Sequence, residues 1–132
     1  MRKLPLEKLN GVWSATPTPF TKDLKVDAVA VKRMVEHHLR LGVNGLFLAG
    51  TCGEGPWMSE VEQSRLVRNV KKYAKRKLVI AVQVTDNSAS RVVANIKTAK
   101  RDGADLAIVA PPLFFLNANN GTLTNHYRQI LK

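Results

Sequence analysis

Residues 45–82 read GLFLAGTCGEGPWMSEVEQSRLVRNVKKYAKRKLVIAV and contain one complete strand–helix–strand unit. The unit begins and ends with runs that are apolar at every position, 45–49 and 78–82, as is typical of strands covered on both faces of a parallel sheet. Between the runs, Ser59 and Glu62 predict a capping box at the start of a helix. The apolar stripe of that helix is formed by Leu66, Val67, Val70, Tyr73 and Ala74. This order of elements predicts a right-handed βαβ unit.

The same alternation continues on both sides of this unit. Apolar runs at 12–15 and 106–110 predict a first and a fourth strand. A first helix is predicted from about Asp27 to a glycine stop at Gly42, and a third helix ends at Gly103. A fourth helical pattern carries the apolar residues Leu123, Tyr127, Ile130 and Leu131.

The whole chain, residues 1–132, is therefore predicted to form a single α/β domain of four βα units, about 30 residues apart. Periodicity leaves two architectures open, a small doubly wound sheet and half of a (β/α)₈ barrel. A complete barrel takes about 250 residues, so this chain would supply only half of one. Four barrel strands leave two free sheet edges and an open inner face, so the isolated chain is expected to associate with other molecules or to remain partly molten.

Positive charge dominates the chain, since 21 Lys and Arg residues against 10 Asp and Glu residues give a formal net charge of +11. The basic side chains form two groups: Arg65, Arg68, Lys71, Lys72, Lys75, Arg76 and Lys77, and then Lys97, Lys100 and Arg101. Both groups fall near the C-terminal ends of predicted helices, where cations complement the helix dipole. Only Tyr73 interleaves with the first group, and no stacking platform accompanies it. We therefore predict solvated helix faces rather than a nucleic-acid partner, with the first group remote from the loop at 50–57.

The cellular setting is predicted from three absences in the sequence. No apolar run approaches the length of a membrane span, and Pro5 and Glu7 interrupt any signal-like apolar segment near Met1. The one cysteine, Cys52, cannot form a disulfide within the chain. These features predict a cytoplasmic protein with no membrane partner.

The loop at 50–57 is the strongest candidate for a binding site. In parallel α/β folds the working face lies at the C-terminal ends of the strands, which is where this loop falls. Three glycines in six residues allow a tight turn, in which backbone N–H groups and the Thr51 hydroxyl converge on a carboxylate or a phosphate. The alternative is a glycine-rich turn with no ligand. The motif matches neither a P-loop nor a dinucleotide fingerprint.

Three segments of the chain carry a family resemblance. The first is GVWSA at 11–15 with TPF at 18–20, the second is GTCGE at 50–54, and the third is GAD at 103–105 followed by VAPPLFF at 109–115. In this order and spacing they resemble the dihydrodipicolinate synthase / N-acetylneuraminate lyase family, in which the second strand is followed by the signature G-[TS]-[TS]-G-E. The resemblance implies that the four βα units are the N-terminal half of a (β/α)₈ TIM barrel rather than a doubly wound sheet.

The resemblance also implies a class I aldolase mechanism without a cofactor or a metal. In the family a lysine on the sixth strand forms a Schiff base with pyruvate or another 2-oxo acid, and a tyrosine after the fourth strand relays protons. The signature loop holds the substrate carboxylate. Carried over to this chain, the substrate-binding residues are Thr51, Cys52 and Gly53. Family members are commonly tetramers, so a homo-oligomer is expected.

The chain departs from the family pattern at its catalytic positions. Phe114 falls on the tyrosine position, or Leu113 or Phe115 if the alignment shifts by one residue, and none of these side chains can move a proton. The Cys52 thiol is a weaker hydrogen-bond donor than the hydroxyl it replaces. The sixth strand and its lysine fall outside the 132 residues, so the chain alone is expected to be inactive although its parent activity is that of a lyase or aldolase. The alternative is a non-catalytic relative that acts as a 2-oxo-acid-binding or oligomerisation module.

Other residues are interpreted structurally. His37 and His38 are adjacent on a helix and cannot chelate one metal together, and His38 falls on the apolar stripe. Trp57 is predicted to pack against the rest of the chain, and Ser88 to cap the third helix. Lys22 and Lys25 lie in a solvated loop and Lys77 precedes its strand, so none is a good substitute for the Schiff-base lysine.

Overall fold

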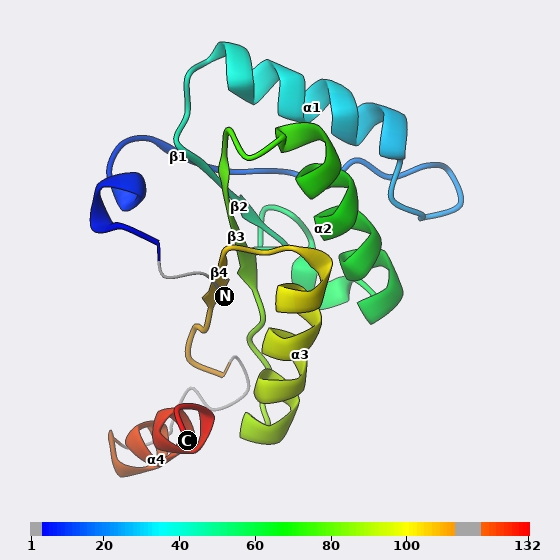
Figure 1. Cartoon of the computed structure of the whole chain (residues 1–132). Helices are drawn as coiled ribbons and strands as arrows, with labels where there is room; N and C mark the ends of the chain where they lie inside the picture. Colours follow the sequence, from blue (N-terminus) through cyan, green and yellow to red (C-terminus); the bar gives the residue numbers. More distant parts are fainter. Residues whose placement is uncertain (1–3, 113–119) are drawn as a thin grey trace.

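The computed structural model describes residues 4–112 and 120–132, and Figure 1 shows how the elements are arranged. The elements in chain order are η1 (Leu6–Leu9), β1 (Trp13–Ala15), α1 (Ala28–Arg40), β2 (Gly45–Leu48), η2 (Gly55–Trp57), α2 (Glu60–Ala74), β3 (Val79–Gln83), α3 (Ala89–Asp102), β4 (Leu106–Ile108) and α4 (Asn120–Ile130). The four predicted βα units are therefore confirmed. No helix in these two ranges is long and apolar enough to cross a membrane.

The four strands form one parallel sheet in the order β1-β2-β3-β4. In the register, Ala15 lies beside Phe47 and Phe47 beside Ala81. A doubly wound sheet reverses its strand order at a switch point, whereas this order runs straight through. The fold class predicted from the family resemblance, a run of consecutive barrel strands, agrees with this topology.

The continuous hydrophobic core lies on the helix side of the sheet, although Val79 and Ala81, which face the other side, are also buried. Helices α1, α2 and α3 all cover the helix side (Figure 1), where the fully buried strand residues are Leu46, Leu48, Ile80 and Val82. On the other face, Ala15 is exposed and Ile108 is 36% exposed at the two edge strands. Four barrel strands were expected to leave the inner face of the sheet open. In the described residues β1 and β4 are covered on the helix side alone.

Two helix starts illustrate what the sequence predicted and what it missed. Helix α1 begins after Asp27, as expected, and the Asp27 side chain caps it. The Ser59 hydroxyl accepts the Glu62 N–H at 3.3 Å. The Glu62 carboxylate does not complete the predicted capping box. Its Oε2 instead accepts the Val26 N–H at 2.6 Å, and its Oε1 pairs with Arg65 at 2.9 Å. Glu62 thereby ties the segment before α1 to the first turn of α2.

Two further expectations are corrected. Ser88 occupies the N-cap position of α3, but its hydroxyl lies 2.8 Å from the Ser90 hydroxyl and makes no capping bond. The turn is instead held by Asp86, whose carboxylate accepts the Ser88 N–H at 3.2 Å. Trp57, predicted to pack, is 74% exposed because η2 carries it to the outer surface.

His38 has the structural role that was predicted for it. Its Nδ1 donates to the Met34 carbonyl at 2.8 Å, and its Nε2 lies 2.8 Å from the Ser14 hydroxyl. Since a carbonyl only accepts, Nδ1 carries a proton, and the Ser14 hydroxyl is the hydrogen-bond partner of Nε2. The imidazole therefore joins α1 to β1.

The C-terminal end of α2 lies at the N-terminal end of the strands. Lys71 Nζ is 3.1 Å from Asp105 Oδ1, just before β4, and Asp105 Oδ2 accepts the Ile80 N–H at 3.0 Å. The loop at 50–57 leaves the opposite end of β2. The prediction that the basic group is remote from this loop is confirmed for its C-terminal members, Lys71 to Lys77. Arg65 instead lies in the N-terminal half of α2, where it pairs with Glu62.

Candidate functional site

The glycine-rich loop follows β2 at the C-terminal end of the sheet and contacts the segment that follows β1. The Thr18 hydroxyl donates to the Gly53 carbonyl at 2.6 Å, and both residues are buried. The Thr16 N–H donates to the Phe47 carbonyl at 3.2 Å, which continues the β1–β2 pairing by one residue. The two neighbouring segments therefore form one rigid rim.

The glycines of this loop provide space rather than unusual backbone angles. A Cβ on Gly55 would lie 1.7 Å from the Ala49 carbonyl oxygen, and one on Gly53 would lie 2.9 Å from the Thr16 carbonyl oxygen. Neither glycine has a positive φ. The left-handed residues are instead Ala49, at φ 54°, and Glu54, at φ 56°. The expectation that glycines allow the turn is corrected: side-chain-bearing residues turn the chain, at about 1 kcal/mol each, and such strain is often found at functional sites.

The hydrogen bonds of the loop divide its donors into two sets. The N–H groups of Gly53 and Gly55 both donate to the Gly50 carbonyl, at 3.0 and 3.1 Å, and the Glu54 N–H donates to Thr51. Thr51 and Cys52 are exposed, and no hydrogen bond from their N–H groups or side chains is found in the described residues. Thus Thr51 and Cys52 present open donors, whereas the Gly53 N–H is already used within the loop.

No residue in the described part of the chain supplies a Schiff-base lysine. Within residues 4–112 and 120–132 no lysine is buried. Lys22 and Lys25 are exposed in the loop after β1, and Lys77 is exposed at the opposite end of the sheet. A lysine needs an apolar pocket or a neighbouring cation to lower its pKa for such chemistry. Phe114, at the predicted tyrosine position, lies outside the described residues.

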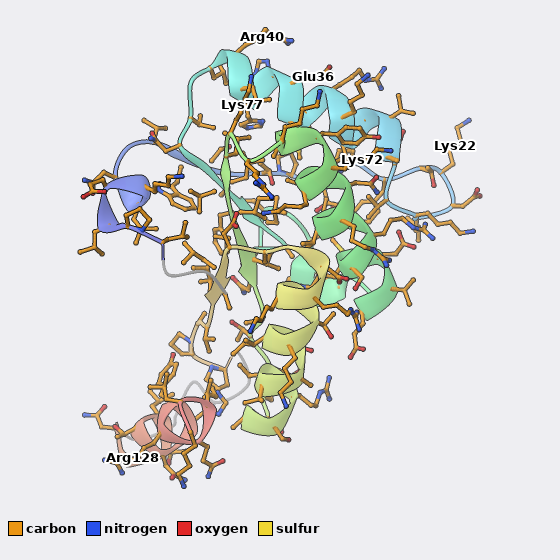
Figure 2. All side chains as sticks on the ribbon, viewed as in Figure 1. Lys22, Glu36, Arg40, Lys72, Lys77 and Arg128 are labelled. Atoms are coloured by element: carbon orange, nitrogen blue, oxygen red, sulfur yellow. The ribbon has the colours of Figure 1, made fainter. Side chains whose placement is uncertain are left out.

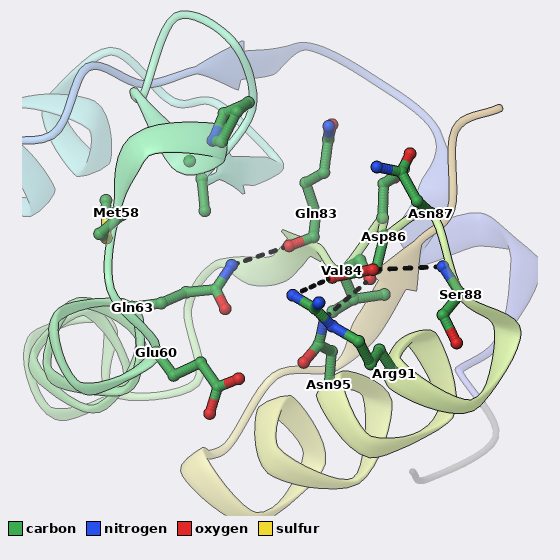
Figure 3. Close-up of a pocket in the computed structure, with 14 residues that line it drawn as sticks. Met58, Glu60, Gln63, Gln83, Val84, Asp86, Asn87, Ser88, Arg91 and Asn95 are labelled. Atoms are coloured by element: carbon green, nitrogen blue, oxygen red, sulfur yellow. Dashed lines mark hydrogen bonds and ion pairs between the residues drawn. The ribbon is translucent and has the colours of Figure 1, made fainter. Parts of the chain in front are cut away.

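A cavity of about 540 Å³, which sequence reasoning did not find, opens between the N-terminal ends of α2 and α3 (Figure 3). Gln63 Nε2 donates to the Gln83 carbonyl at 2.9 Å, and Arg91 pairs with Asp86 at 3.0 Å. The charge of Arg91 is thereby balanced within the wall. In the sequence, only the polar residues Asp86, Asn87 and Ser88 after β3 pointed to this region, and they were interpreted as a loop and a helix cap. Thr51, Cys52 and Gly53 do not line this cavity, which lies on the helix side of the loop.

With this geometry established, the chain can be compared with known proteins. The sequence pattern of the "Dihydrodipicolinate synthetase family" matches residues 8–132. This chain belongs to that family. The resemblance drawn from the GTCGE loop and its flanking segments is confirmed, and with it a family of the lyase or aldolase type.

Among curated relatives, the 4-hydroxy-tetrahydrodipicolinate synthase of Chlorobium luteolum is 32% identical over 123 residues, which cover 93% of this chain and 41% of that protein. The corresponding synthase of Pelodictyon phaeoclathratiforme is 35% identical over 122 residues, or 92% and 41% of the two chains. The chain thus spans about two fifths of the length of the curated relatives it matches.

Solved structures of the family confirm the fold. A monomeric dihydrodipicolinate synthase variant aligns with a TM-score of 0.86 at 30% identity, over 97% of this chain and 42% of its own. YagE, a prophage protein of E. coli K12 in the same family, solved in complex with pyruvate, aligns with a TM-score of 0.83 over 91% and 40% of the two chains. At 22% identity this second likeness shows the fold alone. The four βα units are a part of the family's TIM barrel.

Proposed function

We propose that the protein belongs to a Schiff-base lyase or aldolase that acts on pyruvate or a related 2-oxo acid, and that residues 1–132 are one partial barrel domain carrying its carboxylate-binding loop. The observation that carries this proposal is the pair of open donors at Thr51 and Cys52, in a loop that the buried hydrogen bond from the Thr18 hydroxyl to the Gly53 carbonyl holds in place. Family membership and the pyruvate complex of YagE support the choice of ligand.

The substrate carboxylate would accept hydrogen bonds from the Thr51 hydroxyl and from the N–H groups of Thr51 and Cys52. The thiol of Cys52 adds little as a donor, so the backbone carries most of the binding at that position. Gly53 contributes by its small size, since a side chain there would push the loop from Thr16. Binding of the carboxylate fixes the ketone carbon for attack.

Schiff-base formation needs a neutral lysine amine that attacks the ketone carbon and expels its oxygen as water. Because no described lysine is buried, we propose that this amine comes from outside residues 1–132. The chain by itself then binds the acid without forming an imine.

A second candidate function is that of a non-catalytic relative that binds a 2-oxo acid or forms oligomers. Phe114 favours it, because phenylalanine cannot relay the proton that the family's tyrosine carries. A polypeptide that contains this chain and traps pyruvate covalently would exclude this candidate.

Borohydride trapping tests the proposed division of roles. Incubation of the 132-residue chain with pyruvate and sodium borohydride should leave its mass unchanged, since no lysine is activated. The same treatment of a longer polypeptide that contains this segment and a sixth strand should add one reduced pyruvyl group. A stoichiometric adduct on the isolated chain, mapped to one lysine by peptide mass analysis, would contradict the assignment.

Alkylation of Cys52 tests carboxylate binding directly. Cys52 is the one cysteine of the chain and is exposed, so iodoacetamide should modify it readily. Saturating pyruvate should slow this modification at least fivefold, and Thr51→Val should weaken the protection about fivefold, the loss of one hydrogen bond of about 1 kcal/mol. Sodium chloride at equal ionic strength is the control. Equal protection by chloride would show that no carboxylate site exists at the loop.

A further inference from the structure

Seven exposed cations gather at the end of the sheet opposite the glycine-rich loop, and we call this surface the basic end. It consists of Arg40, Lys72, Lys75, Arg76, Lys77, Lys100 and Arg101. Arg40 ends α1, the next four residues end α2 and form the turn after it, and the last two lie in the final turn of α3. Figure 2 shows Arg40, Lys72 and Lys77 in the upper part of the molecule, where α1 and α2 end.

Helix packing joins cations that are far apart in the sequence. Helix α2 packs along α1 on one side and along α3 on the other. Gly103, which caps α3, lies directly against α2, since a Cβ placed on it would come within 2.8 Å of Lys71 Cγ. The two basic groups were interpreted as separate solvated helix faces. The structure instead makes them parts of one surface.

Few carboxylates balance this surface. Asp105 pairs with Lys71, and Asp102 is buried, where it accepts a hydrogen bond from Ser64. Of the seven cations, Arg101 alone pairs with a carboxylate in the described part of the chain, at 3.4 Å from Asp102. The other six exposed cations form no ion pair in the described residues. Glu36, one turn before Arg40 on α1, pairs with Lys32 at 3.8 Å (Figure 2).

The helix dipole does not account for all of these cations. Its influence is limited to the last turn of a helix, whereas Lys75, Arg76 and Lys77 follow the end of α2. Lys75 and Arg76 have φ angles of 47° and 64°, in the left-handed region that a helix end usually gives to glycine or asparagine. Two long cationic side chains thus occupy a strained turn that exposes them.

We propose that the basic end binds the phosphate backbone of a nucleic-acid duplex without reading its sequence. A duplex offers fixed phosphates at high density, and each cation that neutralises one releases condensed counterions. No exposed Phe, Tyr or Trp side chain accompanies these cations in the described residues: Tyr73 is partly buried with Lys72 Nζ 5.5 Å from its ring centre, and Trp57 lies beyond the other end of β2. The imidazole of His37, in the last turn of α1, is exposed. The surface therefore fits phosphates rather than stacked bases. This activity is separate from the proposed lyase function and lies at the opposite end of the sheet.

The test compares two triple variants that lose equal charge. One combines Lys72→Gln, Lys77→Gln and Lys100→Gln at the basic end, none of which is ion-paired or left-handed. The matched control combines Lys22→Gln, Lys25→Gln and Arg33→Gln, which are also exposed but lie in the loop after β1 and in the first half of α1, away from the basic end. Binding of a fluorescent 20-base-pair DNA duplex of arbitrary sequence is followed by anisotropy as a function of salt, with circular dichroism to verify folding.

The unmodified chain should bind with an affinity that falls steeply with salt. The basic-end variant should reduce the slope of log K against log salt by about 2.7, and the affinity at 100 mM salt by roughly two orders of magnitude. The control variant should change the slope by less than about 1. Equal losses in both variants, or no binding by the unmodified chain at 20 mM salt, would overturn the proposal. Competition by polyglutamate as effective as that by unlabelled duplex would also overturn it, in favour of an acidic protein partner.

Discussion

Replacement of Gly55 by alanine should destabilise the protein more than any other single methyl addition in the glycine-rich loop. The added Cβ would lie 1.7 Å from the Ala49 carbonyl oxygen and 2.5 Å from its carbon, both backbone atoms. No side-chain rotation can relieve such a contact, so the loop must move away from β2. We expect the free energy of unfolding to fall by about 4 kcal/mol or more, measured by urea denaturation.

Gly42→Ala is the matched control for this change. Gly42 has a φ of 70°, and nothing lies within 4 Å of its hypothetical Cβ. The cost should therefore be that of the left-handed backbone alone, about 1 kcal/mol. If both variants lose the same free energy of unfolding, the contact between a Cβ at position 55 and the Ala49 carbonyl is not what requires glycine there.

Truncation of two leucines should show that the two faces of the sheet differ. Leu46 is fully buried on the helix side, so Leu46→Ala should lower the free energy of unfolding by about 4 kcal/mol. Leu106 lies beside Ala81 on the face that no described helix covers and is only partly buried. Leu106→Ala should therefore cost about 1 kcal/mol. Equal losses in urea denaturation would mean that the open face is covered in solution, as the expected association of the chain would also require.

The order of strands and helices was predictable because hydrophobic periodicity is a local property of the sequence. The run at 78–82 and the strand Val79–Gln83 differ by one residue at each end, and the glycine stop of the third helix at Gly103 is correct. The choice of a barrel over a doubly wound sheet was not local. It came from the family resemblance, since the two folds share the same βα repeat.

Details of the candidate site were harder to predict, because they depend on which atoms meet across the sheet. Glu62 has the spacing of a capping box, but its carboxylate instead accepts a hydrogen bond from the Val26 N–H, 36 residues earlier in the chain. Gly55 is needed because it lies against the Ala49 carbonyl, and the number of glycines in the loop does not reveal this contact. The cavity beside Arg91 lies between α2 and α3, and the distance between these two helices cannot be predicted from a sequence pattern.

The strictly sequential strand order has a consequence for how the molecule opens. Each strand pairs only with strands of units adjacent to its own in the chain, so the interactions are those of nearest neighbours in a one-dimensional array. In such an array unfolding can begin at either end and spread inward. Strands β1 and β4 have one paired neighbour each in the described residues, whereas β2 and β3 have two. Amide protons of the inner strands should therefore exchange with solvent last, and the loop that joins β2 to α2 is anchored to the slowest-opening part of the chain.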